Sequence, residues 1–373
     1  MTLQTPPKAT RDSNIELLRV VLMLMIIGYH LIVHGAKVGG PDGDYTIAGY
    51  TSVAYLLLKC FLVIAVNCFV FISGYYRINF RMGTVVSLIL QTSFYALGIQ
   101  LVFSAITGAP VILGLSSLPD LILPIFKGTW WFITGYFGLY LVSPLLNMGI
   151  DACTRPQLLF VVVIFTVLNA VSGFLFGSGG VLGSNGGYSL FSFIHIYLIG
   201  RYAARFIADR SLRQWSAAVY LLSSLALFLL VYLSISRLDN LGIARLFKYN
   251  NPLILISAIS FFFFFKSFRL QSPLVNRLAA GVLGVYLLHD HRLVREHVIE
   301  NLYAWSLNFP GYLHFLTLLL ITVSVFMAGF LVDKAREMLL DPVARYAVEQ
   351  LGLHRIDRIF GKEPAREVYR QIP

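Results

Sequence analysis

Charged residues are scarce in this chain. They make up 13% of its 373 residues, whereas 57% are hydrophobic. Soluble domains carry about 25% charged residues, so this shortage excludes an ordinary soluble protein. The apolar residues are gathered into segments of the length that a membrane-spanning helix needs, about 20 residues. The sequence therefore predicts an all-α, polytopic membrane bundle.

Cysteine is also rare, and basic residues are not concentrated in one place. The chain has 3 cysteines, and Cys60 and Cys68 fall in one apolar segment, so no disulfide framework is indicated. The net charge is +11, but the basic residues lie between the apolar segments, as in cytoplasmic loops of membrane proteins. This distribution favours a lipid bilayer as the partner over nucleic acid. The glycine-rich stretch 177–187 lacks the Lys-Ser/Thr of a phosphate-binding loop and is interpreted as a flexible connector.

The hydropathy pattern predicts about ten spans. It divides the chain into a cytoplasmic N-terminal segment (1–13), a membrane domain (14–333) and a cytoplasmic tail with an amphipathic helix (334–373). The excess of basic residues in alternate loops places both chain ends in the cytoplasm, which requires an even number of spans. The predicted cores are 15–34, 51–73, 84–106, 129–149, 157–176, 189–208, 214–236, 251–268, 276–290 and 312–333.

The sequence also predicts how two further segments lie relative to the membrane. The stretch 107–128 is apolar but broken by three prolines, which favours a segment that re-enters the membrane or lies on it. The run of five phenylalanines from Phe261 to Phe265 is expected to face lipid.

The first span contains Glu16, Arg19 and His30, in the sequence NIELLRVVLMLMIIGYH. On an α-helix, Arg19 and His30 are about 20° apart in azimuth and about 16 Å apart along the axis. Either alone is explained by a position at a membrane interface. Their shared face favours a common cavity, because ionisable groups within a membrane usually face the bundle interior. Glu16 is spaced to pair with Arg19, and His34 lies one turn beyond His30.

Other polar residues in the spans have simpler explanations. The cluster from His289 to His291 offers metal-ligand types, but no second ligand set has a recognisable spacing, so no metal is expected and a solvated helix end is favoured. Trp130 and Trp131 are typical of an interfacial aromatic belt. Ser73 is interpreted as a hydrogen-bonding residue between helices, and His195 as either a packing residue or a functional one.

An acidic residue followed by Leu-Arg, then ten residues and a histidine, resembles the signature of the acyltransferase-3 family of bacterial integral membrane O-acyltransferases. Three further stretches resemble segments of that family. The resemblance covers residues from about 14 to 333. The three stretches are NCFVFISGYYR (67–77), KGTWWFITGYFGLYLVSPLLN (127–147) and GVLGVYLLH (281–289).

The resemblance implies a bacterial inner-membrane enzyme that uses acetyl-CoA from the cytoplasm as its acyl donor. The acceptor it implies is a hydroxyl of a cell-envelope glycan, such as an O-antigen, capsule or exopolysaccharide precursor. The family's arginine–histidine pair corresponds to Arg19 and His30. Arg77 and Arg81 stand where the family commonly has further arginines, although their spacing of three intervening residues differs from the two of some members.

The same residue types fit that chemistry without the resemblance. Histidine, with an ordinary pKa of about 6.5, is the usual general base for a hydroxyl, and arginine binds phosphates by charge-assisted hydrogen bonds. These properties predict that His30 is catalytic and that Arg19, with Arg77 or Arg81, binds the donor. Tyr286 and His289 gain a supporting role from the resemblance of the late segment.

Two questions stay open at this stage. His30 could activate the acceptor for direct attack, or it could carry the acyl group as a covalent relay. A different function also fits an Arg–His pair on one helix face. The chain could be a transporter or flippase for a lipid-linked envelope sugar, with Arg19 and His30 on its translocation path, or, less favoured, a glycan polymerase.

Overall fold

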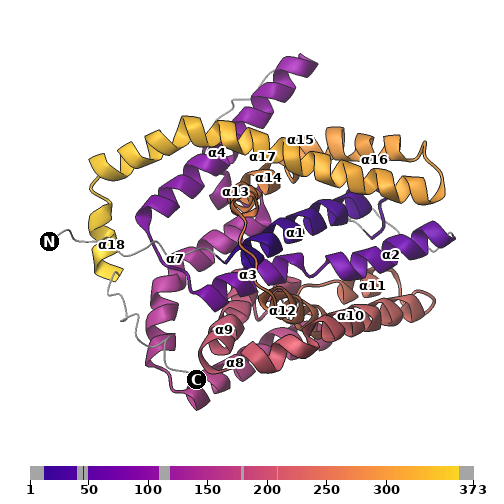
Figure 1. Ribbon diagram of the computed structural model, residues 1–373, viewed down its shortest axis with the longest axis horizontal. Helices are drawn as coiled ribbons and strands as arrows, with labels where there is room; N and C mark the ends of the chain where they lie inside the picture. Colours follow the sequence, from indigo (N-terminus) through magenta and orange to yellow (C-terminus); the bar gives the residue numbers. More distant parts are fainter. Residues whose placement is uncertain are drawn as a thin grey trace.

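The computed structural model describes residues 12–39, 45, 49–108, 118–177, 180–207 and 209–360, and within these ranges it contains helices and turns but no β-strand. The long helices run side by side as a bundle (Figure 1). The all-α bundle that the sequence predicts is confirmed. The first half of the described chain forms α1 (Ser13–His30), η1 (Leu31–Gly35), α2 (Tyr50–Leu62), α3 (Ala65–Tyr76), α4 (Met82–Thr107), α5 (Leu118–Ile122), α6 (Pro124–Lys127), α7 (Trp131–Ala152), α8 (Arg155–Thr166) and η2 (Val167–Leu175).

The second half begins with a short 3₁₀ turn and ends with the longest helix. It forms η3 (Asn185–Gly187), α9 (Leu190–Phe206), α10 (Asp209–Ser234), α11 (Asn240–Leu246), α12 (Pro252–Lys266), α13 (Pro273–Ala280), α14 (Val282–His289), α15 (Arg292–Val294), η4 (Arg295–Ile299), α16 (Glu300–Ser306), α17 (Gly311–Gln350) and α18 (His354–Phe360).

Seven stretches of the described chain are helical, apolar and long enough to cross a membrane. The protein is therefore a multi-pass membrane protein by helix length and composition. The other three predicted cores coincide with shorter elements, namely α9 with 17 residues, α12 with 15, and α13 and α14 with 8 each. The seven stretches are Ser13–Gly35, Thr51–Tyr76, Met82–Thr107, Trp131–Ala152, Arg155–Leu175, Arg213–Ser234 and Gly311–Gln350.

Several spans are interrupted where they border one internal cavity. The α-helix of the first span changes to a π-helix directly after His30. A turn at Val63 separates α2 from α3, and Gly281 separates α13 from α14. Irregular backbone at membrane depth is tolerated where it is covered by protein or lines a cavity, and π-helical turns are frequent at functional sites.

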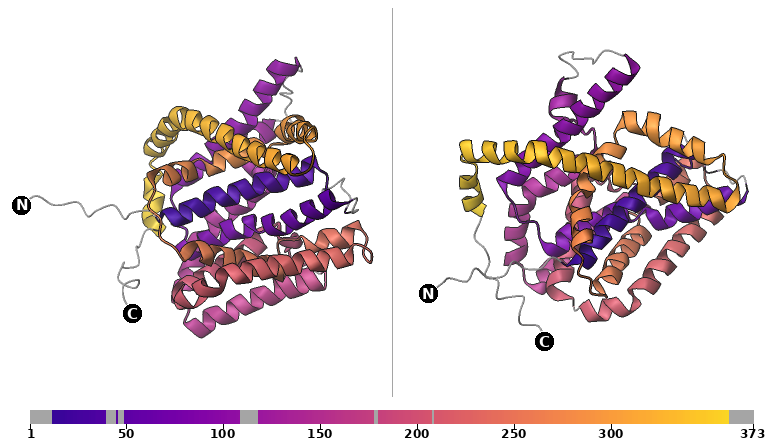
Figure 2. Two further views of the ribbon diagram at one scale, coloured as in Figure 1. Left: turned by 45° about the vertical axis from the view of Figure 1, so that its right-hand side comes forward. Right: turned by 45° about the horizontal axis from the view of Figure 1, so that its top comes forward.

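Helix α1 lies inside the bundle. It contacts α2, α3, α12, α13, α14 and α17, and α17 passes over it in Figure 1. On the other side of the molecule, α3 packs along α9 and α10 packs along α12. The C-terminal part of α4 stands out from the bundle in both views of Figure 2, and Ile106 in it is 75% exposed. The residues of α1 are thus enclosed by helices from both halves of the chain.

The phenylalanine run is buried, so the expectation that it faces lipid is wrong. Phe262 and Phe263 are 0% and 2% exposed, and Phe264, at 37%, is the most exposed of the five. Their helix, α12, lies between α3 and α10 rather than at the edge of the bundle. A helix that is apolar on all sides is suited to this interior position.

Helices α3 and α9 cross closely at a pair of glycines. A Cβ atom added at Gly74 would lie 2.5 Å from the carbonyl oxygen of Tyr197, and one added at Gly200 would lie 2.8 Å from the carbonyl oxygen of Phe71. Small residues allow helix backbones to approach closely in membranes. This crossing fixes the position of α3, which forms one wall of the cavity described below.

Replacing Gly200 with leucine is expected to destabilise the protein by about 1–3 kcal/mol or more, because the backbones must separate to admit the side chain. Thermal unfolding of the purified variants in detergent measures this effect. Gly98→Leu is the matched control, since a Cβ at Gly98 meets no atom within 4 Å. An unchanged unfolding temperature for Gly200→Leu would contradict the close crossing.

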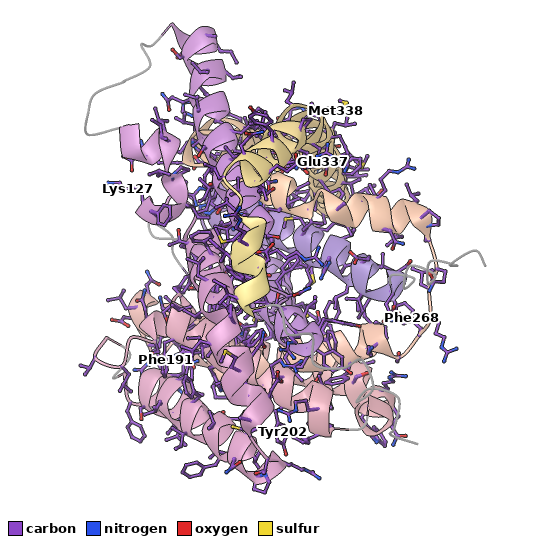
Figure 3. All side chains as sticks on the ribbon, turned by 90° about the vertical axis from the view of Figure 1, so that its left-hand side faces the viewer. Lys127, Phe191, Tyr202, Phe268, Glu337 and Met338 are labelled. Atoms are coloured by element: carbon purple, nitrogen blue, oxygen red, sulfur yellow. The ribbon has the colours of Figure 1, made fainter. Side chains whose placement is uncertain are left out.

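Helix α17 has 40 residues and continues beyond the predicted end of the membrane domain at residue 333. Figure 3 shows Glu337 and Met338 on α17 in the upper part of the molecule and Tyr202, on α9, near the bottom. Asp333 is 1% exposed and accepts a hydrogen bond of 2.8 Å from Arg336. The part of the helix around this ion pair therefore still packs inside the bundle, against α4 and α14.

The proline-broken stretch 107–128 is described only in part, since residues 109–117 lie outside the described ranges. Its described part forms α5 and α6, which contact α4 and α7.

Candidate active site

Arg19 and His30 line the same internal cavity, which has a volume of about 310 Å³. Its wall combines α1 with parts of α3, α7 and α14 and with Tyr249 from the loop before α12. The two ionisable residues therefore share one space as well as one helix face. The side chain of Arg19 is 39% exposed and that of His30 is 16% exposed, so the arginine lies at the more open end.

Most of the cavity wall is apolar or aromatic. Such a wall excludes water and strengthens the few polar interactions inside it. Besides Arg19 and His30, the lining side chains are Met23, Ile26, Tyr29, Leu62, Val63, Ala65, Val66, Phe69, Ile72, Ser73, Leu88, Trp131, Phe132, Ile133, Tyr136, Tyr249, Ala279, Ala280, Val282, Leu283 and Tyr286.

A chain of hydrogen bonds sets the protonation of the His30 ring. Nδ1 of His289 lies 2.7 Å from the carbonyl oxygen of Val285, and its Nε2 lies 3.2 Å from Nδ1 of His30. A carbonyl oxygen only accepts, so Nδ1 of His289 donates and Nε2 of a neutral His289 carries a lone pair. Nδ1 of His30 then donates to it. This arrangement leaves Nε2 of His30 unprotonated, as a general base requires.

A buried carboxylate stands beside the two histidines. Asp290 is 7% exposed, and its Oδ1 lies 3.6 Å from Nδ1 of His30 and 3.3 Å from Nη1 of Arg295. An imidazole that takes up a proton becomes a cation, and a carboxylate at this distance stabilises it. His34 packs with its ring centroid 5.3 Å from that of His30. The geometry thus supports both the neutral form of His30, before it accepts a proton, and the protonated form afterwards.

The favoured sequence interpretation of residues 289–291 as a solvated helix end is wrong for the first two of them. His289 and Asp290 are 1% and 7% exposed. They are buried because α14 packs against α1, α4 and α17, and sequence spacing gives no sign of this packing. Asp290 and Arg295 are residues that the sequence did not single out for the site.

Replacing His289 with phenylalanine is expected to lower kcat of the acyl transfer that the sequence resemblance implies by about tenfold, with KM for both substrates little changed. Phenylalanine fills the space but cannot accept the proton of His30 Nδ1, so the favoured tautomer is lost. Steady-state kinetics with the purified enzyme measures the effect. His289→Gln, which can still accept a hydrogen bond, should retain more activity. A KM effect without a kcat effect would contradict the positioning role.

Donor atoms of His30, His34 and Asp290 lie within 4.8 Å of one another, a spacing that a metal ion could bridge. Two of these residues already have other polar partners. Nδ1 of His30 faces His289 and Oδ1 of Asp290 faces Arg295. A cationic guanidinium on a carboxylate disfavours a metal cation on the same oxygen. The arrangement therefore fits proton transfer better than metal binding.

At the other end of α1, Nη1 of Arg19 lies 3.3 Å from a carboxylate oxygen of Glu16. The pairing predicted from their spacing is present and holds the guanidinium at the cavity. Arg77 and Arg81 are not among the residues that line the cavity. Arg77 pairs with Asp151 at 2.9 Å, and Arg81 is exposed at the start of α4, where its backbone N–H donates to the Tyr140 hydroxyl.

Ser73 and Tyr286, predicted as supporting residues, both line the cavity. The Ser73 hydroxyl lies 3.2 Å from that of Tyr136. The Tyr286 ring stands edge-on to His289, with centroids 6.0 Å apart. His195, in contrast, is fully buried between Thr166 and Asn169, which it meets at 2.9 Å each, so it is a packing residue.

The tryptophan pair divides between two roles. Trp130 is 1% exposed and packs near His291, whereas Trp131 lines the cavity and stacks on Tyr249 with centroids 5.6 Å apart. The sequence interpretation as an interfacial belt misses the second role. A loop that follows α11 supplies Tyr249, and nothing in its local sequence indicates a place in the site.

Comparison with known proteins agrees with this geometry. The family model described as the acyltransferase domain, acyltransferase 3, matches residues 12–332. The chain belongs to the acyltransferase-3 family. No curated protein and no solved structure matches it. The protein is accordingly a membrane-bound acyltransferase, and the match includes all the residues that line the cavity.

Proposed function

We propose that this acyltransferase moves an acetyl group from acetyl-CoA to a hydroxyl of a cell-envelope glycan in the bacterial inner membrane. The observation that carries the proposal is the single cavity that both Arg19 and His30 line. Its donor end would bind a polyanionic cofactor, and its other end offers an unprotonated imidazole nitrogen. An enzyme with these two ends joins a donor from one side of the membrane to an acceptor from the other.

The donor end supports acetyl-CoA through arginine. The half-exposed Arg19 would meet a phosphate of CoA, with which arginine forms charge-assisted hydrogen bonds. Glu16 keeps the guanidinium oriented until the donor arrives. Arg77 and Arg81, which flank the turn between α3 and α4, lie outside the cavity and would contact parts of CoA that remain at the membrane surface.

The acceptor end supports base catalysis by His30. In the proposed reaction Nε2 of His30 takes the hydroxyl proton while the oxygen attacks the thioester carbonyl carbon. The carbon–sulfur bond breaks, the acetyl group stays on the acceptor oxygen, and the departing thiolate receives the proton from His30. Asp290 stabilises the intermediate imidazolium. We prefer direct attack over an acyl-histidine relay. The contacts of the His30 ring with His289 and Asp290 hold the ring in position and support its role as a proton acceptor.

The charge distribution supports a topology with both chain ends in the cytoplasm. In this topology the end of α1 that contains Arg19 faces the cytoplasm, as do the basic loops. His30 lies about 16 Å further along the helix axis, toward the periplasm. This orientation gives Arg19 access to cytoplasmic acetyl-CoA.

Mass spectrometry of surface glycans from a strain lacking this protein tests the proposal. The glycan is expected to lose the mass increment of one acetyl group, and the wild-type gene should restore it. A His30→Ala gene should not. Unchanged acetylation of every surface glycan in the deletion strain would overturn the proposed function.

A further inference from the structure

A second cavity, of about 350 Å³, lies between the end of η2, the described part of the glycine-rich stretch (residues 177 and 180–187) and the segment from the last turn of α11 to Asn250. None of its lining residues in the described chain is acidic, and two are basic. Those residues are Gly173, Phe174, Gly177, Gly180, Asn185, Gly186, Arg245, Lys248 and Asn250. We name this cavity the outer pocket. Helix α11, whose last turn contains Arg245, lies at the same end of the bundle as the C-terminal end of α1 (Figure 1).

Glycines bring the loop close to both basic side chains. A Cβ added at Gly186 would lie 2.7 Å from Cδ of Lys248, and one added at Gly177 would lie 3.5 Å from Nη2 of Arg245. Nε of Arg245 also donates to the carbonyl oxygen of Phe174 at 2.9 Å. The loop and the two cations therefore form one built surface, in which Arg245 is held by backbone carbonyls.

Of the two basic residues, Lys248 has fewer polar contacts with the protein. It is partly buried, and its ammonium lies 5.1 Å from the centroid of the Tyr188 ring. Within the described ranges no carboxylate forms an ion pair with it. Beside it, Asn250 is 1% exposed and its Oδ1 has no hydrogen-bond partner in the described chain, although its amide nitrogen donates to the Asn169 carbonyl. The pocket thus offers a cation and a free acceptor.

The outer pocket and the catalytic cavity share a wall. Lys248 and Asn250 line the outer pocket, and Tyr249 between them lines the cavity that contains His30. The Tyr249 ring packs on Tyr188 with centroids 4.8 Å apart, and on Trp131. A molecule held in the outer pocket would therefore stand next to the acceptor end of the catalytic cavity.

We propose that the outer pocket binds an anionic group, a carboxylate or a phosphate, carried by the acyl acceptor. This inference rests on the proposed function and deepens it, because it makes the acceptor an acidic glycan. Lys248 and Arg245 pair with the anion, and Oδ1 of Asn250 accepts a hydrogen bond from a neighbouring sugar hydroxyl. The group anchored here leaves another hydroxyl of the glycan free to reach His30.

Binding to the purified full-length protein in lipid nanodiscs tests the inference without depending on acyl transfer. The probes are an oligogalacturonate, its uncharged methyl ester and inorganic diphosphate. Lys248→Met removes the charge and keeps the apolar stem. Arg237→Gln is the matched control, since it removes an exposed charge after α10 and does not line the pocket.

At least one anion is expected to bind with an affinity that falls by on the order of tenfold in Lys248→Met. The affinity should be preserved in Lys248→Arg and in the control, and should weaken with salt. Preference for oligogalacturonate assigns a sugar carboxylate, and preference for diphosphate assigns a phosphate-linked glycan. Equal binding of the methyl ester, or no dependence of anion binding on Lys248, would overturn the inference.

The result separates this inference from the proposed function. Lys248-dependent anion binding in a protein that transfers no acetyl group would leave the pocket in place and overturn the transferase mechanism. Acetyl transfer with a preference for neutral glycans would support the transferase mechanism and overturn the inference about the outer pocket.

Discussion

Replacing His30 with alanine is expected to lower kcat for acetyl transfer by about 10²- to 10⁴-fold, the contribution typical of a positioned general acid–base group. His30 is the one histidine of the described chain that lines the catalytic cavity, and its neighbours hold it in the base tautomer. The affinity for acetyl-CoA should change little, because the donor phosphates are assigned to the opposite end of α1. Single-turnover transfer with radiolabelled acetyl-CoA measures both quantities.

His297→Ala is the control for this prediction. His297 is exposed on η4 and packs against Phe103, away from the cavity. Its removal should leave the rate unchanged. A His30→Gln variant separates packing from chemistry, since glutamine can occupy the site but cannot take the proton. Near wild-type transfer by His30→Gln would exclude His30 as the base.

The second large effect is expected at Arg19. Arg19→Ala should raise KM for acetyl-CoA by about 10- to 100-fold, which corresponds to the loss of a charged hydrogen bond worth about 1.5–3 kcal/mol. Because the proposed contact of the arginine is with a part of the donor that does not react, kcat at saturating donor should fall much less. Kinetics at varied acetyl-CoA distinguishes the two parameters.

Two further variants define the role of the guanidinium. Arg19→Lys keeps the charge but loses the planar fork, so its KM should fall between those of the wild type and Arg19→Ala. Arg155→Gln removes an exposed charge at the start of α8, outside the cavity, and should have no effect. A kcat loss in Arg19→Ala with unchanged KM would place Arg19 in the chemical step instead of donor binding.

The sequence predicts those parts of the site that lie within one helix. The positions of Arg19 and His30 follow from the periodicity of α1, and Glu16 pairs with Arg19 as its spacing predicts. The membrane class follows from composition in the same way. His289 and Tyr286 are predicted as site residues only because the late segment GVLGVYLLH resembles a segment of the family. The spacing of residues within that segment does not indicate a role for them.

The parts that could not be predicted depend on contacts between distant segments. His30 and His289 are 259 positions apart, and Tyr249 reaches the cavity from a loop. Lys59 is a similar case, since it lies within an apolar span and is fully buried. Its ammonium donates to the carbonyl oxygens of Val38 and Gly39. Local hydropathy contains no information about such partners.

The measurement that tests the central claim most directly uses membrane vesicles of defined orientation from cells that make the protein and its acceptor. Acetyl-CoA labelled in its acetyl group is supplied outside inside-out vesicles, where it meets only the cytoplasmic face. The account predicts label in the glycan of these vesicles, and none in those from a His30→Ala strain. Equal labelling with the His30→Ala protein, or labelling only when acetyl-CoA meets the periplasmic face, would contradict it.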